Sequence, residues 1–459
     1  THTHTHTHTH THTHTHTHSL PHPPSLACLH GSNSLAWRRR EVVRVSIAGV
    51  TYSRVIDART GRVVPSQVVV DPNRGTNDVF FAADLGPLEM ATFKLELGVV
   101  SSSSSTKKKK EEEEEENLAK ATAAQASNNN SSNSNNSNTT SSTSSSSSNM
   151  TYLCNGAVCA SFDAAGRPVE WRNLVTGDTR ALALALVYME ERPPLDSTFS
   201  GSNVYDFTPT GSRDNWWGDD AEVTLDAAGP VVWQVTAKLR PGVFVTYRLL
   251  NASLVDAPLQ ETLQVQTHTG VLPANTTGSL LLRFTTDIGS AGNFTTDSNA
   301  FQRKQRQFDS GVPYSGNFYP MVGTASVANA NGSATLTLAA ARPLAVTSPT
   351  PGVLEAMVHR RLNTIDLRGN DTSVMDDVLL FALGSASRTQ QHASAMALRH
   401  LHPLDIHAVA GDVSAAHAHV PVVVDLDTIL SSCSTKQVVV VVVMVCGGKG
   451  KRGEEMECG

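Results

Sequence analysis

Short runs of alternating apolar and polar residues are the feature that most limits how this chain can fold. Val243, Val245, Tyr247 and Leu249 occupy every second position, and the stretch 280–284 repeats the pattern. A period of two is typical of a strand with one face buried. We find no ten-residue amphipathic helical pattern before about residue 385 and expect a single helix over 393–401. Many strands without intervening helices predict an all-β fold.

The predicted strands fall into two blocks. Residues 37–100 predict a small β-sandwich module, and residues 151–412 predict a large β-sandwich. The remaining segments are of low complexity: a Thr-His repeat and a Pro/Ser stretch over 1–36, a Ser/Lys/Glu/Asn insert over 101–150, and a valine-rich, charged tail over 413–459. Since such segments have little apolar surface to bury, we expect all three to be disordered.

Composition excludes two classes of partner. The formal net charge is −6, and the basic run Arg38–Arg40 is short and lacks interleaved aromatic residues. We therefore expect no nucleic-acid interface. No apolar run approaches the roughly 20 residues that a membrane-spanning helix needs, so we expect no membrane span.

Cysteine and asparagine patterns bear on the compartment. No paired CxxC motifs are present, which argues against a structural zinc site. Cys154 and Cys159 in the larger block are either a disulfide or two buried free thiols at a strand edge. Several asparagines fit the Asn-X-Ser/Thr acceptor pattern and indicate a protein of the secretory pathway: Asn149, Asn251, Asn275, Asn293, Asn331 and Asn370.

Three stretches of the larger block carry more specific information. The first is Leu-Glu-Ala-Met-Val-His-Arg-Arg-Leu at 354–362, followed by Asp366, Arg368 and Gly369. The second is Thr-Asp-Ile at 286–288 with Phe-Thr-Thr-Asp-Ser-Asn at 294–299, and the third is Gly-Asn-Phe-Tyr-Pro at 316–320. Their order and spacing resemble those of glycoside hydrolase family 38, the class II, lysosomal-type α-mannosidases. Val-Tyr-Asp-Phe-Thr-Pro at 204–209 is similar to a further element of that family.

The resemblance implies that the chain corresponds to the C-terminal β-domains of a retaining α-mannosidase. The larger block would then be a β-supersandwich of the galactose-mutarotase type. The whole enzyme would hydrolyse terminal α-mannose from N-glycans in the lysosome, in the vacuole or outside the cell. This chain would supply the scaffold and the rim of the cleft, with mannose-containing N-glycans and the missing N-terminal catalytic domain as its partners.

The family's catalytic chemistry is not encoded in this sequence. Retaining hydrolysis needs a carboxylate nucleophile and a carboxylic acid about 5 Å apart, and the family also uses zinc held by two histidines and two aspartates. The corresponding His-x-Asp and His-His-Asp elements do not occur here. We therefore expect zinc in the full-length enzyme but neither catalytic residues nor bound zinc in this chain. His400 and His402 near Asp405 are better explained as a solvated helix end.

The resemblance assigns two positions to substrate binding, one of Arg360 and Arg361 together with Tyr205. A guanidinium offers a planar fork of donors to sugar hydroxyls, and a tyrosine hydroxyl can donate and accept. The alternative is that the arginines form a salt bridge at a domain interface while Tyr205 is an ordinary strand aromatic. A non-catalytic, carbohydrate-binding or structural β-sandwich is the alternative function for the chain as a whole.

Overall fold

The computed structural model describes residues 26–48, 51–71, 76–98, 150–193, 201–203, 205–273, 277–299, 302–363 and 369–409. The predicted disorder of the insert over 101–150 and of the tail over 413–459 concerns residues outside these ranges, apart from residue 150. The same holds for the Thr-His repeat.

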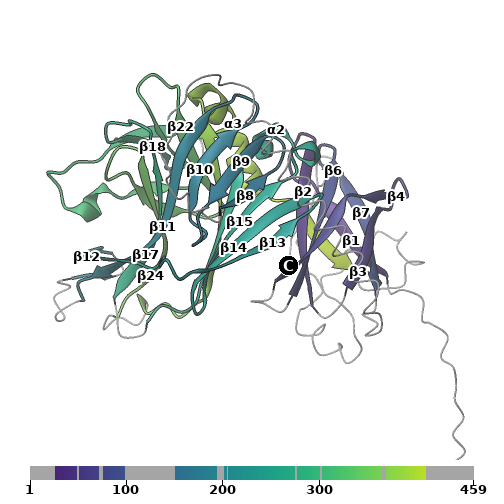
Figure 1. The fold of residues 1–459 in the computed structure, drawn as a ribbon, viewed down its shortest axis with the longest axis horizontal. Coiled ribbons are helices and arrows are strands. Elements are labelled where there is room, and N and C mark those ends of the chain that lie inside the picture. The colour runs from purple at the N-terminus through teal and green to yellow at the C-terminus, as the bar shows by residue number, and fades with distance from the viewer. Residues whose placement is uncertain are drawn as a thin grey trace, which may run out of the picture.

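Two sheets pack face to face in the small module (Figure 1). One has the order β26-β1-β7-β3-β4, and the other has the order β2-β6-β5. Buried side chains from both sheets, such as Val45, Phe81 and Phe93, form a common core. The strands are β1 (Leu26–Ser32), β2 (Arg39–Ala48), β3 (Thr51–Asp57), β4 (Arg62–Val64), β5 (Ser66–Asp71), β6 (Thr76–Leu85), β7 (Met90–Gly98) and β26 (Asp405–Val409).

Two boundary predictions are wrong at this module. β1 lies within the segment 1–36 that was expected to be disordered, yet Leu29 is 2% exposed in the core and β1 pairs with strands on both sides. β26 lies within the segment assigned to the large sandwich, yet it pairs with β1 and extends the small module's sheet. Both strands are short and owe their place to backbone pairing, which leaves little trace in the hydrophobic pattern.

The large module consists of two nine-stranded sheets. The first has the order β20-β23-β24-β17-β11-β10-β9-β8, with β12 beside β11. Its strands are β8 (Thr151–Cys154), β9 (Val158–Phe162), β10 (Pro168–Asn173), β11 (Thr179–Glu191), β12 (Pro209–Asn215), β17 (Gly278–Thr286), β20 (Tyr319–Met321), β23 (Leu344–Thr347) and β24 (Val353–Arg361).

The second sheet has the order β13-β14-β15-β16-β25-β22-β21-β18-β19. The alternating residues of both sheets meet in one core, which includes Val245, Tyr247, Leu282 and Phe284. The strands are β13 (Glu222–Ala228), β14 (Val232–Arg240), β15 (Val243–Leu250), β16 (Leu263–Thr269), β18 (Asn293–Asp297), β19 (Arg303–Gln307), β21 (Thr324–Ala328), β22 (Thr335–Ala340) and β25 (Met375–Gly384).

The prediction of an all-β fold with a small and a large sandwich is confirmed. The described helices are the short α2 (Ala257–Gln260) and α3 (Ala386–Leu401), with single 3-10 turns at Ala252–Leu254 and Tyr314–Asn317. The predicted helix therefore begins earlier than expected, at Ala386. None of the described helices is long and apolar enough to cross a bilayer. Cys154 and Cys159 form a disulfide across the hairpin of β8 and β9.

A buried charge network joins the two modules. Arg39 of β2 is fully buried and binds Glu41 through Nε at 2.7 Å, while its Nη1 donates to the carbonyl oxygen of His402. Arg399 of α3 binds both Glu41 and Asp256 at 2.7 Å. Guanidinium groups that each bind two partners hold the end of α3 against the small module.

Candidate functional site

Residues of the predicted motifs come together on one face of the first sheet. This face, on β11, β17 and β24, points away from the core between the two large sheets. Leu186, Leu282 and Leu354 of the same strands point into that core. We call the residues on the opposite face the outer-face cluster: Glu191, Phe207, Arg213, Arg283, Tyr314, Phe318, Glu355 and Arg360.

A β-bulge in β24 brings Arg360 to this face. Glu355 pairs with Arg283 on the outer face, but the register shifts beyond Met357, so that His359 lies opposite Leu280 and Arg360 opposite Ser279. Strand residues alternate between faces, and one extra residue reverses the alternation beyond it. Without the shift, Arg360 would follow Leu354 and Ala356 into the apolar core.

Arg360 is bound to a buried carboxylate. Its Nη2 lies 2.6 Å from Oε2 of Glu191, and its Nε lies 3.0 Å from Oε1. The Glu191 side chain is fully buried, whereas that of Arg360 is 21% exposed. The Ser279 hydroxyl also donates to Glu191. The predicted alternative of an arginine salt bridge is therefore present in the structure, although both partners lie within the large module.

The remaining Arg360 donors hold the loop that carries Tyr205. Nη1 donates to the carbonyl oxygen of Asn203 at 3.1 Å, and Nη2 donates to that of Asp206 at 2.7 Å. The Asn203 side chain accepts from the backbone amides of Tyr205 and Asp206. Tyr205 is 84% exposed and lies in this loop, so the alternative that it is a strand aromatic is wrong.

Arg361 points to the opposite side of the strand from Arg360. It is 5% exposed, its Nε donates to Oδ1 of Asn370 at 2.8 Å, and its Nη1 donates to the carbonyl oxygen of Leu272. Of the three predicted substrate-binding residues, Tyr205 and Arg360 are thus brought together, and Arg361 is held apart in the interior.

Glu355 forms a second buried carboxylate site on the same face. Its side chain is 1% exposed and accepts from Nε of Arg283 at 2.7 Å, from Nη1 of Arg213 at 3.3 Å and from the Tyr314 hydroxyl. Burial and the nearby Glu355 carboxylate raise the pKa of Tyr314 well above its ordinary value. The phenol therefore remains a donor to Glu355 at neutral pH.

Aromatic rings connect the two carboxylate sites. Arg360 lies over the ring of Phe207, with 5.5 Å between guanidinium and ring centroid, and Phe207 contacts Phe318 edge to face at 5.3 Å. Phe318 in turn contacts Tyr314 at 5.5 Å, and Arg213 lies over the Tyr314 ring at 4.6 Å. These cation–π and edge-to-face contacts join segments that are far apart in the sequence.

The outer-face cluster is suited to holding the loop around Tyr205 in a fixed position rather than to acid–base chemistry. Both of its carboxylates are buried and bound to guanidinium groups, which leaves neither as a general acid. The described residues contain no group of three or more His, Cys, Asp and Glu side chains placed to hold a metal ion. The nearest histidine–carboxylate pairs are His359 with Asp371 at 3.7 Å and His268 with Asp376 at 3.0 Å. Neither pair fits the two-histidine, two-aspartate zinc set of the family.

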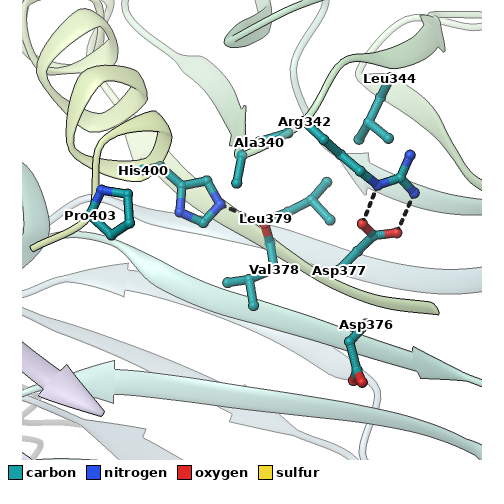
Figure 2. A pocket seen from close by; sticks show the side chains of 10 residues that line it. Ala340, Arg342, Leu344, Asp376, Asp377, Val378, Leu379, His400 and Pro403 are labelled. Atoms are coloured by element: carbon teal, nitrogen blue, oxygen red, sulfur yellow. Dashed lines mark hydrogen bonds and ion pairs between the residues drawn. The ribbon is translucent and has the colours of Figure 1, made fainter. Parts of the chain in front are cut away.

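A pocket of about 320 Å³ lies elsewhere, between the end of α3 and the start of β25 (Figure 2). Arg342 and Asp377 form an ion pair at its rim, with Nη2 of Arg342 2.6 Å from Oδ2 of Asp377. Nε2 of His400 lies 2.7 Å from the carbonyl oxygen of Val378, and burial lowers the pKa of this histidine. His400 therefore faces the pocket wall as a neutral, hydrogen-bonded group, and none of the predicted site residues lines the pocket.

The predicted glycosylation sites differ in exposure. Asn331 and Asn370 are exposed, whereas Asn251 and Asn293 are half-buried. Asn251 also donates through Nδ2 to the carbonyl oxygen of Pro230 at 2.7 Å. Asn149 and Asn275 lie outside the described residues, and use of any of these sites remains a prediction.

Half of the outer-face cluster lies outside the motifs that the sequence offered. Glu191, Arg213, Arg283 and Tyr314 fall in no motif that we singled out. A carboxylate at the end of an otherwise apolar strand, as at Glu191, is the one local signal that could have indicated a buried ion pair. Partners such as Arg213 become neighbours only through the sheet order.

These features define the class of protein. It is a two-module β-sandwich with charged and aromatic side chains on one outer face. Curated α-mannosidases match part of it: mouse α-mannosidase 2x is 41% identical over 98 residues, and human epididymis-specific α-mannosidase is 37% identical over 131 residues. The resemblance to family 38 α-mannosidases that the motifs indicated is confirmed by these relatives. The matches span 21% and 26% of this chain but only 8% and 13% of those proteins.

No protein-family model matches the chain. A glycosyl hydrolase family 38 protein from Enterococcus faecalis gives a TM-score of 0.49 at 13% identity, covering 84% of this chain and 47% of that chain.

Proposed function

We propose that the chain is the C-terminal portion of a retaining α-mannosidase that removes terminal α-mannose from N-glycans. The chain supplies the scaffold and the cleft rim, and a catalytic zinc domain that it does not contain supplies the nucleophile, the acid and the metal. The observation that carries this proposal is the convergence on one outer face of residues from the family-like motifs at 354–362, 316–320 and 204–209, together with the identity to curated α-mannosidases.

Tyr205 is the residue of this chain that we propose to contact the glycan. Its hydroxyl is exposed at the tip of a loop held by many hydrogen bonds, so little conformational entropy is lost when a sugar binds. Arg360 uses most of its five N–H donors on Glu191 and on the carbonyl oxygens of Asn203 and Asp206, and Arg361 is buried. The locations that fit this function are the lysosome, the vacuole and the extracellular space, with glycosylation at exposed acceptors such as Asn331 and Asn370.

An assay with an aryl α-mannoside and added zinc tests the proposal. The chain alone should show no turnover. The chain joined to an α-mannosidase catalytic half that carries the His-x-Asp and His-His-Asp elements should hydrolyse the substrate. Turnover by the chain alone with retained stereochemistry would mean that it holds an active site of its own, and an inactive joined protein that is folded and zinc-loaded would contradict the proposal.

A non-catalytic carbohydrate-binding module is the second candidate, favoured by the exposed Tyr205 beside ordered aromatic rings. In this case the chain alone should bind mannose oligosaccharides on a glycan array, and Tyr205→Ala should abolish binding. Tyr152→Ala is the matched control, because Tyr152 is 58% exposed on β8, an edge strand that β9 and β10 separate from β11 in the sheet order. Absence of binding by the unaltered chain would exclude this alternative.

A further inference from the structure

The β-bulge in β24 that turns Arg360 outward places His359 on the inner face of the same sheet. His359 lies opposite Leu280, whose side chain is part of the core between the two large sheets. The imidazole enters the end of this core, and the side chain is only 1% exposed. Nδ1 lies 3.2 Å from the hydroxyl of Thr269 on β16, so His359 bridges the two sheets.

The other ring nitrogen of His359 has no hydrogen-bond partner among the described residues. Nε2 is buried, and Oδ2 of Asp371, which it faces, is 3.7 Å away. This distance is too long for a hydrogen bond. A neutral imidazole leaves one hydrogen bond unmade here, whereas an imidazolium would also lose the hydration of its charge.

The carboxylate that faces Nε2 belongs to a short segment, residues 369–374, which leads into β25. Two contacts tie this segment to β24. The backbone amide of Leu362 donates to the carbonyl oxygen of Gly369, and Nε of Arg361 donates to Oδ1 of Asn370, both at 2.8 Å. Most of the segment is exposed. A segment with few buried contacts opens at a low cost in free energy.

The charged groups that face His359 offset one another. They are the carboxylates of Asp371 and Asp377 and the guanidinium groups of Arg342 and Arg361. Arg342 and Asp377 also form an ion pair with each other. Since two anions and two cations surround the ring, its burial decides which protonation state is favoured. Burial lowers the pKa of His359 from its ordinary 6.5.

The remaining charged side chains of the neighbouring strands point away from His359. His268 of β16 and Asp376 of β25 lie on the outer face of the second sheet, where Nδ1 of His268 is 3.0 Å from Oδ1 of Asp376. Glu355 and Arg360 lie on the outer face of the first sheet. The protonation of His359 therefore depends on its burial and on the four charged groups that face it.

We propose that segment 369–374 is a pH-sensitive flap over His359 that opens on acidification. At neutral pH the imidazole is uncharged, and the segment stays closed against β24. On acidification the imidazole gains a proton, and the open form is favoured because it admits water to the charged ring.

The direction of the effect follows from proton linkage. Because burial lowers the pKa of His359, the open form binds the proton more readily than the closed form. The stability of the closed form is complete above about pH 6.5 and is lost as the pH falls through the lowered pKa. Hydrogen bonds from the hydroxyl and the backbone amide of Ser373 lower the pKa of Asp371, so this carboxylate stays ionised over the same range.

Hydrogen exchange of the full chain, followed by mass spectrometry, tests this proposal. After correction for intrinsic exchange rates, the open population of 369–374 should rise about two- to five-fold between pH 7.5 and pH 5.0. Exchange in the core strand β15 should stay constant, which separates local opening from global unfolding. His359→Gln should remove the rise. Asp371→Asn should steepen it, because the carboxylate stabilises the imidazolium in the closed form.

His268→Gln is the matched control, because this histidine also lies beside a carboxylate but on the outer face of the second sheet. It should leave the pH dependence of 369–374 unchanged. The proposal is overturned if the unaltered chain shows no rise or if the rise persists in His359→Gln. If His359→Gln does not fold, Asp371→Asn decides: a steeper rise supports the proposal, and an unchanged or absent rise overturns it.

Discussion

Two buried carboxylates on the same face of one sheet are held in different ways. Glu191 relies on a single guanidinium, that of Arg360, with the Ser279 hydroxyl as an additional donor. Glu355 is bound by two guanidinium groups and a phenol. Arg360 also ties down the loop around Tyr205, so one side chain serves both a buried charge and an exposed surface. Glu355 keeps a cationic partner when one of its two guanidinium groups is removed. Glu191 has no second cationic partner among the described residues once Arg360 is removed.

Removing the guanidinium at the Glu191 site should have the largest effect. Arg360→Met leaves a fully buried carboxylate without its cation, and we expect the free energy of unfolding to fall by about 3–5 kcal/mol. Urea denaturation followed by tryptophan fluorescence measures the change. Arg360→Lys should lose less, because the charge remains, but it should not recover the unaltered value, because lysine lacks the planar fork that binds Glu191 and two carbonyl oxygens together.

Removing one guanidinium at the Glu355 site should cost less. In Arg283→Met, Glu355 keeps Arg213 and the Tyr314 hydroxyl, so we expect a loss of about 1.5–3 kcal/mol, the usual value for a hydrogen bond to a charged group. The same denaturation experiment applies. If Arg283→Met destabilises the protein as much as Arg360→Met does, the redundancy of the Glu355 site does not exist.

Tyr314→Phe refines the comparison by removing one neutral donor. We expect a loss of about 1–2 kcal/mol at neutral pH. Since burial and Glu355 raise the pKa of Tyr314, the unfolded chain loses this proton more readily than the folded one, and stability should decline as the pH rises above about 10. The phenylalanine variant should show a shallower decline between pH 9 and 11, with the buried Tyr247 as a titrating group common to both proteins. Identical alkaline slopes would contradict this role for Tyr314.

The two carboxylate sites also show how far sequence reasoning extends. Alternation at period two correctly predicted strands such as 243–249 and 280–284 and the residues that they bury, because neighbouring residues of a strand point to opposite faces. The motif at 354–362 contains both Glu355 and Arg360, but the sequence assigned a role only to the arginine pair.

The predictions that failed, or were never made, concern contacts between segments that are far apart in the sequence, and no local pattern contains these contacts. Strand alternation alone does not reveal the bulge that turns Arg360 outward and Arg361 inward. The pairing of β26 with β1 joins residues almost 380 positions apart, counted from His30 to His407. The partners Glu191, Arg213 and Tyr314 come from three separate segments that meet only when the sheet forms.

Tyr205 should show the smallest effect on stability and a clear effect on function. Because its side chain is 84% exposed, Tyr205→Ala should change the free energy of unfolding by no more than about 0.5 kcal/mol. In the enzyme joined to a catalytic half, loss of one hydroxyl hydrogen bond, worth about 0.5–1.5 kcal/mol, should lower kcat/KM for a mannoside by about two- to ten-fold in Tyr205→Phe. Tyr152→Phe should change neither quantity. A Tyr205→Phe enzyme with unaltered kcat/KM would show that the loop held by Arg360 displays this tyrosine for something other than the sugar, and the contrast between the two carboxylate sites would then concern folding alone.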